Sequence, residues 1–549
     1  MAQPGVTVIE FRTLKKTRRY GAKVKTGCIT CKLRHVRCDE GKPACLKCTN
    51  SGRKCDGYAP VRAAQSKSSS PEGSIISQCS NPMVSEAGEN VRYLEFYHHC
   101  AGTTLSSKFD EGFWSRTTLQ LAQSEPSIRH ALIALGYLNK IEPGSLKHAR
   151  SGFSANSQHE TLFRHYNKAL GSLVMRMTEP SYTPEIGLVA CLLFVCIEFI
   201  RGDYHTAFTH LQSGLKLLFQ SPQNTMIQHN LVSMFNRTMT AALLYGMTVP
   251  DIFDVSITGR QNYPQQTFGI YEIPTPRPQS YPQQAFPSLD EAQAAATQLR
   301  NASIMFIREW GQKLFIKIPV TPDALAIKAQ LLQCHESWSR SFHLLERRSR
   351  FSEEDRVKAS QIKVLHYPMN IAVAVATDMD QTQYDAYTPR FKAINHHVRV
   401  LLDSMGLAGN NTLSNPHSTK PPKAAANFTF EVSVIPSLHY VATRCRCPVT
   451  RREAVAMLEL NPPREALWDA EQHAAVAKRS IEIEEQVVDP ETGWPLESSR
   501  LWAAAIDGDM DENGGFWVAF SYADWAKTCS ISYTRRRRLD AQWDEWFVL

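Results

Sequence analysis

The chain has 549 residues and is 43% hydrophobic and 21% charged, a composition typical of a folded protein and not of a disordered one. Its charge is uneven: residues 1–67 carry 16 Lys and Arg against 4 Asp and Glu, and the rest carries 45 against 49. Because clustered positive charge attracts polyanions, only the beginning of the chain suits a nucleic-acid partner. The longest apolar run, Leu188–Ile197, has ten residues, about half of what a membrane helix needs, so we expect no membrane partner.

A basic arm is expected at residues 1–27. Its clustered charges predict either contacts with phosphates or a nuclear import signal, and the two uses are compatible. A tail that only aids solubility is the alternative. The arm residues that we expect to contact DNA are Lys15, Lys16, Arg18, Arg19, Lys23 and Lys25.

Six cysteines follow the arm with the spacing C-x2-C-x6-C-x6-C-x2-C-x6-C, and the last three repeat the first three after a constant offset of seventeen residues. The chain begins MAQPGVTVIEF, without the features of a secretion signal, so we expect reduced thiols and not disulfides. Six thiolates repel one another and require a cation, and zinc binds sulfur in tetrahedral geometry. The predicted metal ligands are Cys28, Cys31, Cys38, Cys45, Cys48 and Cys55.

Two separate tetrahedra would need eight ligands, so six cysteines hold two zinc ions only if two sulfurs are shared. The pattern resembles the fungal zinc binuclear cluster family of transcription factors, with further matches at Asp39 and Pro43. The resemblance implies two structural zinc ions bridged by Cys28 and Cys45, with no coordination position left open for catalysis. It places the remaining ligands as Cys31 and Cys38 on one zinc and Cys48 and Cys55 on the other.

The segment Lys32–Arg37 lies between the second and third cysteines and predicts a helix of one to two turns, with Leu33 and Val36 on its apolar face. In the family, the first helix enters the major groove and its basic residues read a CGG triplet. The matching positions are Arg34 and His35, and His35 is a departure because the family more often has Lys there. The residues expected on phosphates are Lys32, Arg37, Lys42 and Lys47.

Residues 56–90 are rich in Ser, Gly and other small residues and predict a flexible linker. Many members of the family carry a heptad-patterned helix at this place, which joins two copies. No such pattern occurs here, so the sequence does not decide between a monomer and a homodimer.

Helical patterns dominate from residue 91 onwards. A proline-rich segment, 263–287, separates two helical blocks, and capping signals at Ser288 and Thr321 begin helices of the second block. Short strands are expected near 516–522 and 530–533. The expected helices are 127–138, 166–177, 184–200, 204–219, 288–311, 321–345, 353–367, 390–405, 451–460 and 464–485.

Three phrases, near Cys191, Phe430 and Trp468, resemble the fungal-specific regulatory domain that follows many such zinc clusters. The resemblance implies an all-helical domain that controls activity and contacts partners, without catalysis. No phosphate-binding loop, nucleophile elbow or His-Glu-x-x-His motif occurs. Asp509–Gly514 imitates half of a calcium loop, but Phe520 stands where the cation needs a glutamate.

The sequence therefore predicts a mostly α protein with four parts: a basic arm (1–27), a zinc binuclear cluster (28–55), a flexible linker (56–90) and a helical regulatory domain (91–549). We expect a nuclear, non-enzymatic, sequence-specific regulator of RNA polymerase II genes. Its partners would be double-stranded DNA and the transcription machinery or co-regulators. The resemblance extends to pathway regulators, including those of secondary-metabolite gene clusters. The alternative is a zinc-dependent protein-interaction scaffold without specific DNA readout.

Overall fold

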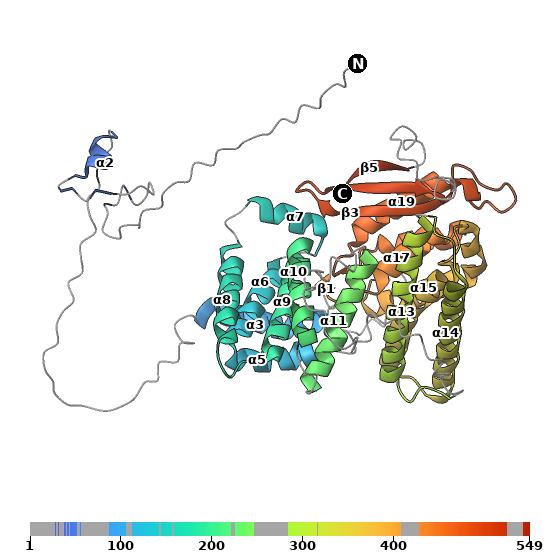
Figure 1. Ribbon diagram of the computed structural model, residues 1–549, viewed down its shortest axis with the longest axis horizontal. Coiled ribbons are helices and arrows are strands. Elements are labelled where there is room, and N and C mark those ends of the chain that lie inside the picture. The colour runs from blue at the N-terminus through green and yellow to red at the C-terminus, as the bar shows by residue number, and fades with distance from the viewer. Residues whose placement is uncertain are drawn as a thin grey trace, which may run out of the picture. The chain divides into compact units, whose positions relative to one another are not determined.

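The structure is a computed structural model whose described residues form two compact units, Met1–Asn81 and Pro82–Leu549 (Figure 1). The basic arm, most of the linker and the second expected strand, 530–533, lie outside the described residues. The described residues are 28, 31, 38–39, 41–42, 44–51, 55, 87–105, 112–141, 144–155, 159–220, 226–245, 284–315, 317–407, 428–523 and 542–549.

The first block of the larger unit is helical. The helix α9 is buried along nearly its whole length, as its apolar sequence predicts, and it ends at Gly202, whose φ of 72° is the left-handed conformation that favours glycine. Asp203 then accepts the Thr206 N–H at 3.0 Å and starts α10. The elements are α3 (Ala87–Phe96), η1 (Tyr97–Ala101), α4 (Gly102–Leu105), η2 (Phe113–Thr117), α5 (Thr118–Ser124), α6 (Pro126–Ile141), α7 (Leu146–Ala155), α8 (Glu160–Met177), α9 (Pro184–Arg201), α10 (Tyr204–Gln220) and α11 (Met226–Tyr245).

The second block begins where the capping signals place it. Ser288 Oγ accepts the Glu291 N–H at 3.2 Å, and Thr321 Oγ1 accepts the Ala324 N–H at 3.2 Å. The elements are α13 (Leu289–Phe315), α14 (Pro322–Arg348), α15 (Glu353–Val375), η5 (Gln381–Tyr387), α16 (Thr388–Ser404), β1 (Phe428–Thr429), α17 (Val434–Arg444), α18 (Pro448–Leu458), β2 (Arg464–Glu465), α19 (Ala470–Glu484) and η6 (Glu497–Ser499).

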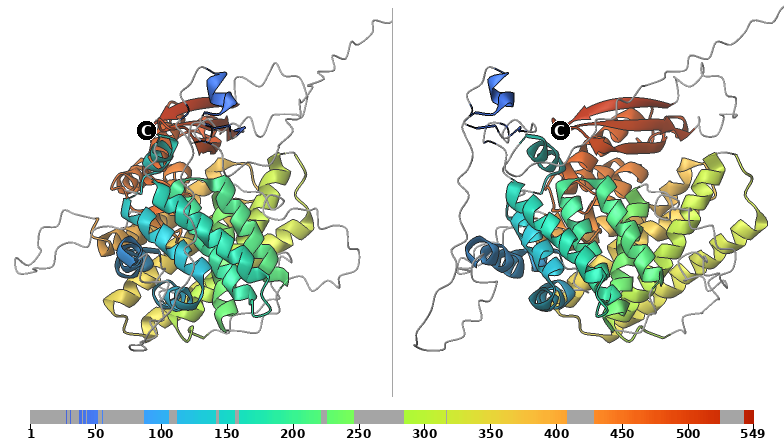
Figure 2. Two further views of the ribbon diagram at one scale, coloured as in Figure 1. Left: turned by 90° about the vertical axis from the view of Figure 1, so that its left-hand side faces the viewer. Right: turned by 60° about the vertical axis from the view of Figure 1, so that its left-hand side comes forward.

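Three strands complete the unit: β3 (Leu501–Met510), β4 (Gly515–Tyr522) and β5 (Gln542–Val548). They form an antiparallel sheet in the order β3-β4-β5, which lies across one end of the helical body (Figures 1 and 2). The mostly α prediction is confirmed, and β4 matches the strand expected near 516–522. The resemblance implied an all-helical domain, and the sheet is a correction to that expectation. Stacking of Phe516 and Phe520 of β4 on aromatic rings of β5 stabilises it.

Several boundaries differ from the sequence-based ones. The helix α3 begins at Ala87, inside the expected linker, and the helix expected from residue 464 begins only at Ala470. Arg464 and Glu465 instead form β2, which pairs in parallel with β1. The carboxylate of Glu465 accepts the N–H groups of Ser433, Val434 and Ile435 at the start of α17. The residue therefore caps another helix and does not continue its own.

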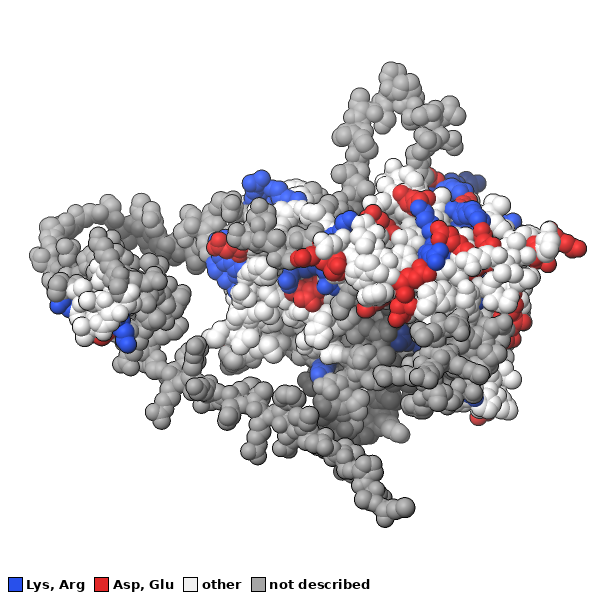
Figure 3. All heavy atoms as spheres, turned by 90° about the horizontal axis from the view of Figure 1, so that it is seen from above, with Lys and Arg blue, Asp and Glu red and all other residues white. Residues whose placement is uncertain are grey.

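The larger unit packs around two hydrophobic clusters. The larger cluster joins α6, α9, α16, α17, α19 and β4, and the smaller one joins α13, α14 and α15 around Trp338. On the face shown in Figure 3, Lys and Arg lie among Asp and Glu, as expected for the nearly balanced charge after residue 67. Among the described helices, no apolar stretch has the length that a membrane crossing requires.

A buried ionic cluster joins α18, α19 and the residues between α17 and α18. Arg446, Arg451 and Glu484 have side chains that are 0% exposed. Glu484 accepts hydrogen bonds from Arg446 at 2.8 Å, from Arg451 at 2.6 Å and from the N–H of Leu501 at 2.9 Å. The two guanidinium groups hold the pKa of Glu484 below its usual range, although burial alone would raise it.

Glu484→Gln is expected to lower the free energy of unfolding by about 3–5 kcal/mol, because it removes the carboxylate that two buried guanidinium groups share. Arg451 then keeps only the longer ion pair with Glu485, at 3.9 Å. Urea denaturation measures the change. Glu482→Gln is the matched control on the same helix, since Glu482 pairs with Arg479 at the surface; there we expect about 0.5 kcal/mol or less. Similar losses in the two variants would contradict the assignment.

Several buried histidines make the stability of the fold depend on pH. Burial lowers the pKa of His335 and of His439 to about 3 and that of His473 to about 4. His366, whose pKa burial also lowers, stacks on Trp338 with ring centroids 4.0 Å apart. Since the unfolded chain takes up these protons near pH 6.5 and the folded chain does not, stability is present above pH 6.5 and is lost as the pH falls towards 3.

The melting temperature should therefore fall between pH 7 and pH 5, with each buried histidine contributing at most about 1.4 kcal/mol per pH unit. His366→Phe keeps a ring over Trp338 and removes one of these groups, so its pH dependence should be shallower than that of the wild type. Thermal denaturation across this pH range tests the expectation. Parallel curves for the two proteins would show that His366 is not a contributor.

Candidate metal centre and nucleic-acid interface

The six predicted metal ligands lie in one cluster within the smaller unit. Cys28 Sγ lies 3.6 Å from Cys45 Sγ and 3.8 Å from Cys48 Sγ, and Cys31 Sγ lies at the same two distances from them. Five of the cysteines are buried and Cys55 is partly buried. The thiol of Cys55 interacts with Cys28, and that of Cys38 with Cys31.

The two halves of the cluster repeat one backbone interaction. The N–H of Cys31 points at Cys28 Sγ, and the N–H of Cys48 points at Cys45 Sγ, both at 3.4 Å. The second pair lies at the start of the short helix α2 (Leu46–Thr49), which Cys45 caps. The seventeen-residue repeat in the sequence is therefore also a repeat in structure, and Cys28 and Cys45 are its equivalent first members.

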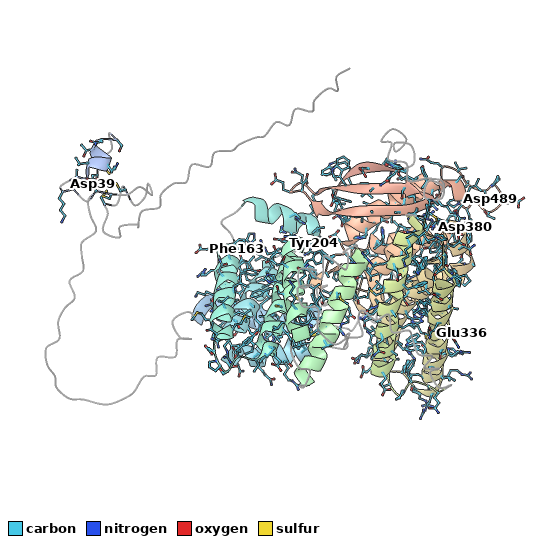
Figure 4. All side chains as sticks on the ribbon, viewed as in Figure 1. Asp39, Phe163, Tyr204, Glu336, Asp380 and Asp489 are labelled. Carbon is cyan, nitrogen blue, oxygen red and sulfur yellow. The ribbon has the colours of Figure 1, made fainter. Side chains whose placement is uncertain are left out.

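Asp39 fixes the start of α2 from outside the helix (Figure 4). Its carboxylate accepts the N–H of Leu46 at 2.9 Å and the N–H of Lys47 at 3.0 Å. These backbone hydrogen bonds hold the pKa of Asp39 below its usual range. The sequence pattern singled out Asp39 only as a match to the family, and the structure supplies its role: it joins the third cysteine to the fourth and fifth.

The donor set fits zinc. With zinc–sulfur bonds of about 2.3 Å, two sulfurs of one tetrahedron lie about 3.8 Å apart, which is close to the observed sulfur separations. Without a metal, burial raises the pKa of the Cys28 thiol to about 12 and raises that of Cys45 further. A bound dication reverses this preference, because it stabilises the thiolates that the buried site otherwise disfavours.

The structure describes two of the expected DNA contacts, Lys42 and Lys47, and both are exposed. Lys47 lies on α2, so its position is tied to the cluster through Asp39. The two expected base readers, Arg34 and His35, lie outside the described residues. The same holds for Lys32, Arg37, Lys15, Lys16, Arg18, Arg19, Lys23 and Lys25.

Comparison with known protein families finds one match that begins in the smaller unit and one within the larger unit. Residues 26–64 match the fungal Zn(2)-Cys(6) binuclear cluster domain, and residues 92–267 match the fungal specific transcription factor domain. The phrase near Cys191 falls within the second match, and those near Phe430 and Trp468 lie beyond it. No solved structure matches the chain.

Three curated relatives illustrate the similarity. The aspercryptin biosynthesis cluster-specific transcription regulator of Emericella nidulans is 21% identical over 89% of this chain and 92% of its own length. A transcription regulator of Purpureocillium lilacinum is 29% identical over 34% of this chain and 48% of its own. Sterol uptake control protein 2 of Saccharomyces cerevisiae is 54% identical over 8% of this chain and 5% of its own.

A sulfur cluster followed by a helical domain defines a zinc-dependent transcription regulator, which is not an enzyme. The chain carries the two domains of this class, a fungal Zn(2)-Cys(6) binuclear cluster domain and a fungal specific transcription factor domain. Its cluster domain binds two zinc ions. Their role is structural, since the cysteines form the buried core among the described residues of the smaller unit.

Asp39→Ala is expected to lower the affinity for zinc about tenfold, because two N–H groups of α2 lose the carboxylate that holds them. Competition with a zinc chelator measures this affinity. Asn50→Ala is the control at the other end of α2, since the recorded capping contacts of Asn50 use its backbone N–H. An unchanged affinity in Asp39→Ala would leave the carboxylate without a role in the cluster.

Proposed function

We propose that this regulator binds DNA in a sequence-specific manner in the nucleus and controls RNA polymerase II genes. The observation that carries the proposal is the buried sulfur cluster, which lies in the part of the chain where positive charge is concentrated. A rigid, metal-closed unit holds basic side chains in fixed positions, which base readout requires.

Within the cluster, Cys28 and Cys45 bridge the two zinc ions. One zinc also takes Cys31 and Cys38, and the other takes Cys48 and Cys55. The short distance between the sulfurs of Cys28 and Cys45, 3.6 Å, supports the shared role. The contact of Cys38 with Cys31 supports placing these two on one zinc. Cys31 Sγ also lies 3.8 Å from Cys48 Sγ, so the assignment of Cys48 and Cys55 to the other zinc rests on the family pattern.

The DNA-reading surface consists of two kinds of side chain. Arg34 and His35 read the edges of a CGG-type triplet in the major groove, and the arginine fork suits the O6 and N7 acceptors of guanine. The phosphate contacts come from Lys32, Arg37, Lys42, Lys47, Lys15, Lys16, Arg18, Arg19, Lys23 and Lys25. The exposure of Lys42 and Lys47 supports that part of the assignment.

The remaining parts have the roles that their composition suggests: an arm at 1–27, the cluster at 28–55, a linker at 56–90 and a regulatory domain at 91–549 that contacts the transcription machinery or co-regulators. The name of the Emericella nidulans relative, aligned over most of both chains, favours a pathway regulator of a biosynthetic gene cluster. Monomeric and homodimeric binding are both compatible with the described residues.

The test is a binding titration with CGG-bearing and scrambled duplexes. Arg34→Ala should weaken binding to the CGG duplex by about 1–3 kcal/mol, tenfold or more, and change binding to the scrambled duplex far less. Selection of bound sites from random DNA then reveals whether one triplet or a spaced pair is preferred.

The charge control is Lys15→Ala combined with Lys16→Ala. Loss of two phosphate contacts should weaken binding to both duplexes and reduce the slope of log affinity against log salt by about two. Equal losses on both duplexes for Arg34→Ala would remove it as a base reader. No preference between the duplexes in the wild type would favour the alternative, a zinc-dependent interaction scaffold.

A further inference from the structure

A cavity of about 220 Å³ lies inside the larger unit, where α11, α13, α15, α17, α19 and β3 meet. Its walls are mainly apolar, with Leu365, Met369, Val432 and Ala503 among them. An apolar cavity with a few polar groups is typical of a small-molecule site. The side chains that line the cavity indicate which kind of ligand it could bind.

One wall of the cavity carries a buried cation. Arg300 of α13 is 7% exposed, and its Nε has no hydrogen-bond partner. Within the part of the chain that the structure describes, Arg300 forms no hydrogen bond or ion pair. A buried guanidinium without such partners is costly, because neither water nor a counter-charge compensates its desolvation. The feature therefore calls for a partner that the protein does not supply.

The charges around Arg300 leave an excess of positive charge. Arg444 also lines the cavity, and its recorded hydrogen bonds go to the side chain of Gln381 and the carbonyls of Leu501 and Trp502. Among the described lining residues there is no Asp or Glu. Glu431 and Arg237 lie in the small neighbouring pocket that shares Arg300. Glu431 attracts the Arg300 cation and Arg237 repels it, and the repulsion is the larger of the two effects.

Another part of the cavity wall contains a hydrogen bond between the helices α15 and α17. Pro368 interrupts α15 and lacks the N–H that would bond to the carbonyl of Val364. Ser437 of α17 donates its hydroxyl to that carbonyl at 3.1 Å. Because Pro368 and Ser437 both line the cavity, this hydrogen bond fixes the backbone at that part of its wall.

We propose that this cavity binds a small amphiphilic carboxylate, whose anionic group pairs with Arg300 and whose apolar body lies against Leu365, Met369 and Ala503. A carboxylate matches the planar donors of a guanidinium better than other groups of its size. A volume of about 220 Å³ equals that of roughly seven water molecules, each of which occupies about 30 Å³ in the liquid. Bonded atoms of a carbon chain pack more closely than separate water molecules, so the cavity suits a carboxylate of medium chain length.

The probe is octanoate, a carboxylate of about ten non-hydrogen atoms, compared with 1-octanol and octylamine of nearly the same length. Isothermal titration calorimetry on the full-length, zinc-loaded protein should give one site for octanoate. Its affinity should exceed that for 1-octanol about tenfold or more, since a charge-assisted hydrogen bond replaces a neutral one, and octylamine should not bind. Equal affinities for the three probes would overturn the proposal.

Arg300→Met removes the charge and keeps the length of the side chain. The variant should lose the preference for octanoate over 1-octanol, whereas Arg300→Lys should retain part of it. The control is Arg340→Gln on the exposed face of α14, which should bind octanoate like the wild type. An unchanged preference in Arg300→Met would overturn the role of Arg300.

A second measurement uses the ligand-free protein. If Arg300 is buried without a counter-charge, Arg300→Met should raise the melting temperature, because replacing such a charge with an apolar side chain removes its desolvation cost. A lower melting temperature would mean that Arg300 has a partner within the folded chain, and the argument for an external anion would fail. Both measurements are independent of DNA binding, so the outcome does not depend on the proposed readout.

Discussion

The constraint that governs the smaller unit is the repulsion among sulfur atoms brought within 4 Å of one another. Buried thiols resist ionisation, and thiolates at this distance repel, so the observed arrangement is stable only around cations. Zinc binding is therefore coupled to folding of the unit, and the surface that faces DNA exists only while the metal is held. Asp39 extends this coupling to α2, because its carboxylate anchors the helix on which Lys47 lies.

The larger unit contains two buried charges whose surroundings differ. Around Glu484 the protein supplies all partners itself, with two guanidinium groups and a backbone N–H on one carboxylate. Around Arg300 the described chain supplies no hydrogen bond to Nε, and the repulsion from Arg237 outweighs the attraction from Glu431. The contrast distinguishes a charge that stabilises the fold from a charge that the fold holds for something else.

The cysteine spacing alone was enough to predict the metal centre, because a repeat of thiols is a chemical signal that survives without tertiary information. Helices of the larger unit were predictable from apolar periodicity and from capping residues such as Ser288 and Thr321. The sheet was only partly predictable, since the sequence of β3 mixes apolar and polar residues without a regular alternation. Its strand forms by pairing with β4, which pairs with β5 on its other side. Glu465 looked helical from its neighbours, and its role as the cap of α17 depends on a contact that no local pattern encodes. Arg300 gave no sequence signal at all, because an arginine on a helix is ordinarily solvated.

The hydrogen bond between Ser437 and the carbonyl of Val364 links the identities of two positions that are distant in the chain. In a homologue with alanine at position 368, the helix would satisfy that carbonyl itself, and a hydroxyl at position 437 would no longer be required there. The two positions should therefore covary in evolution, with serine or threonine at 437 accompanying proline at 368 and apolar residues replacing both. Such a correlation would mark the chains in which this wall of the cavity has the same form.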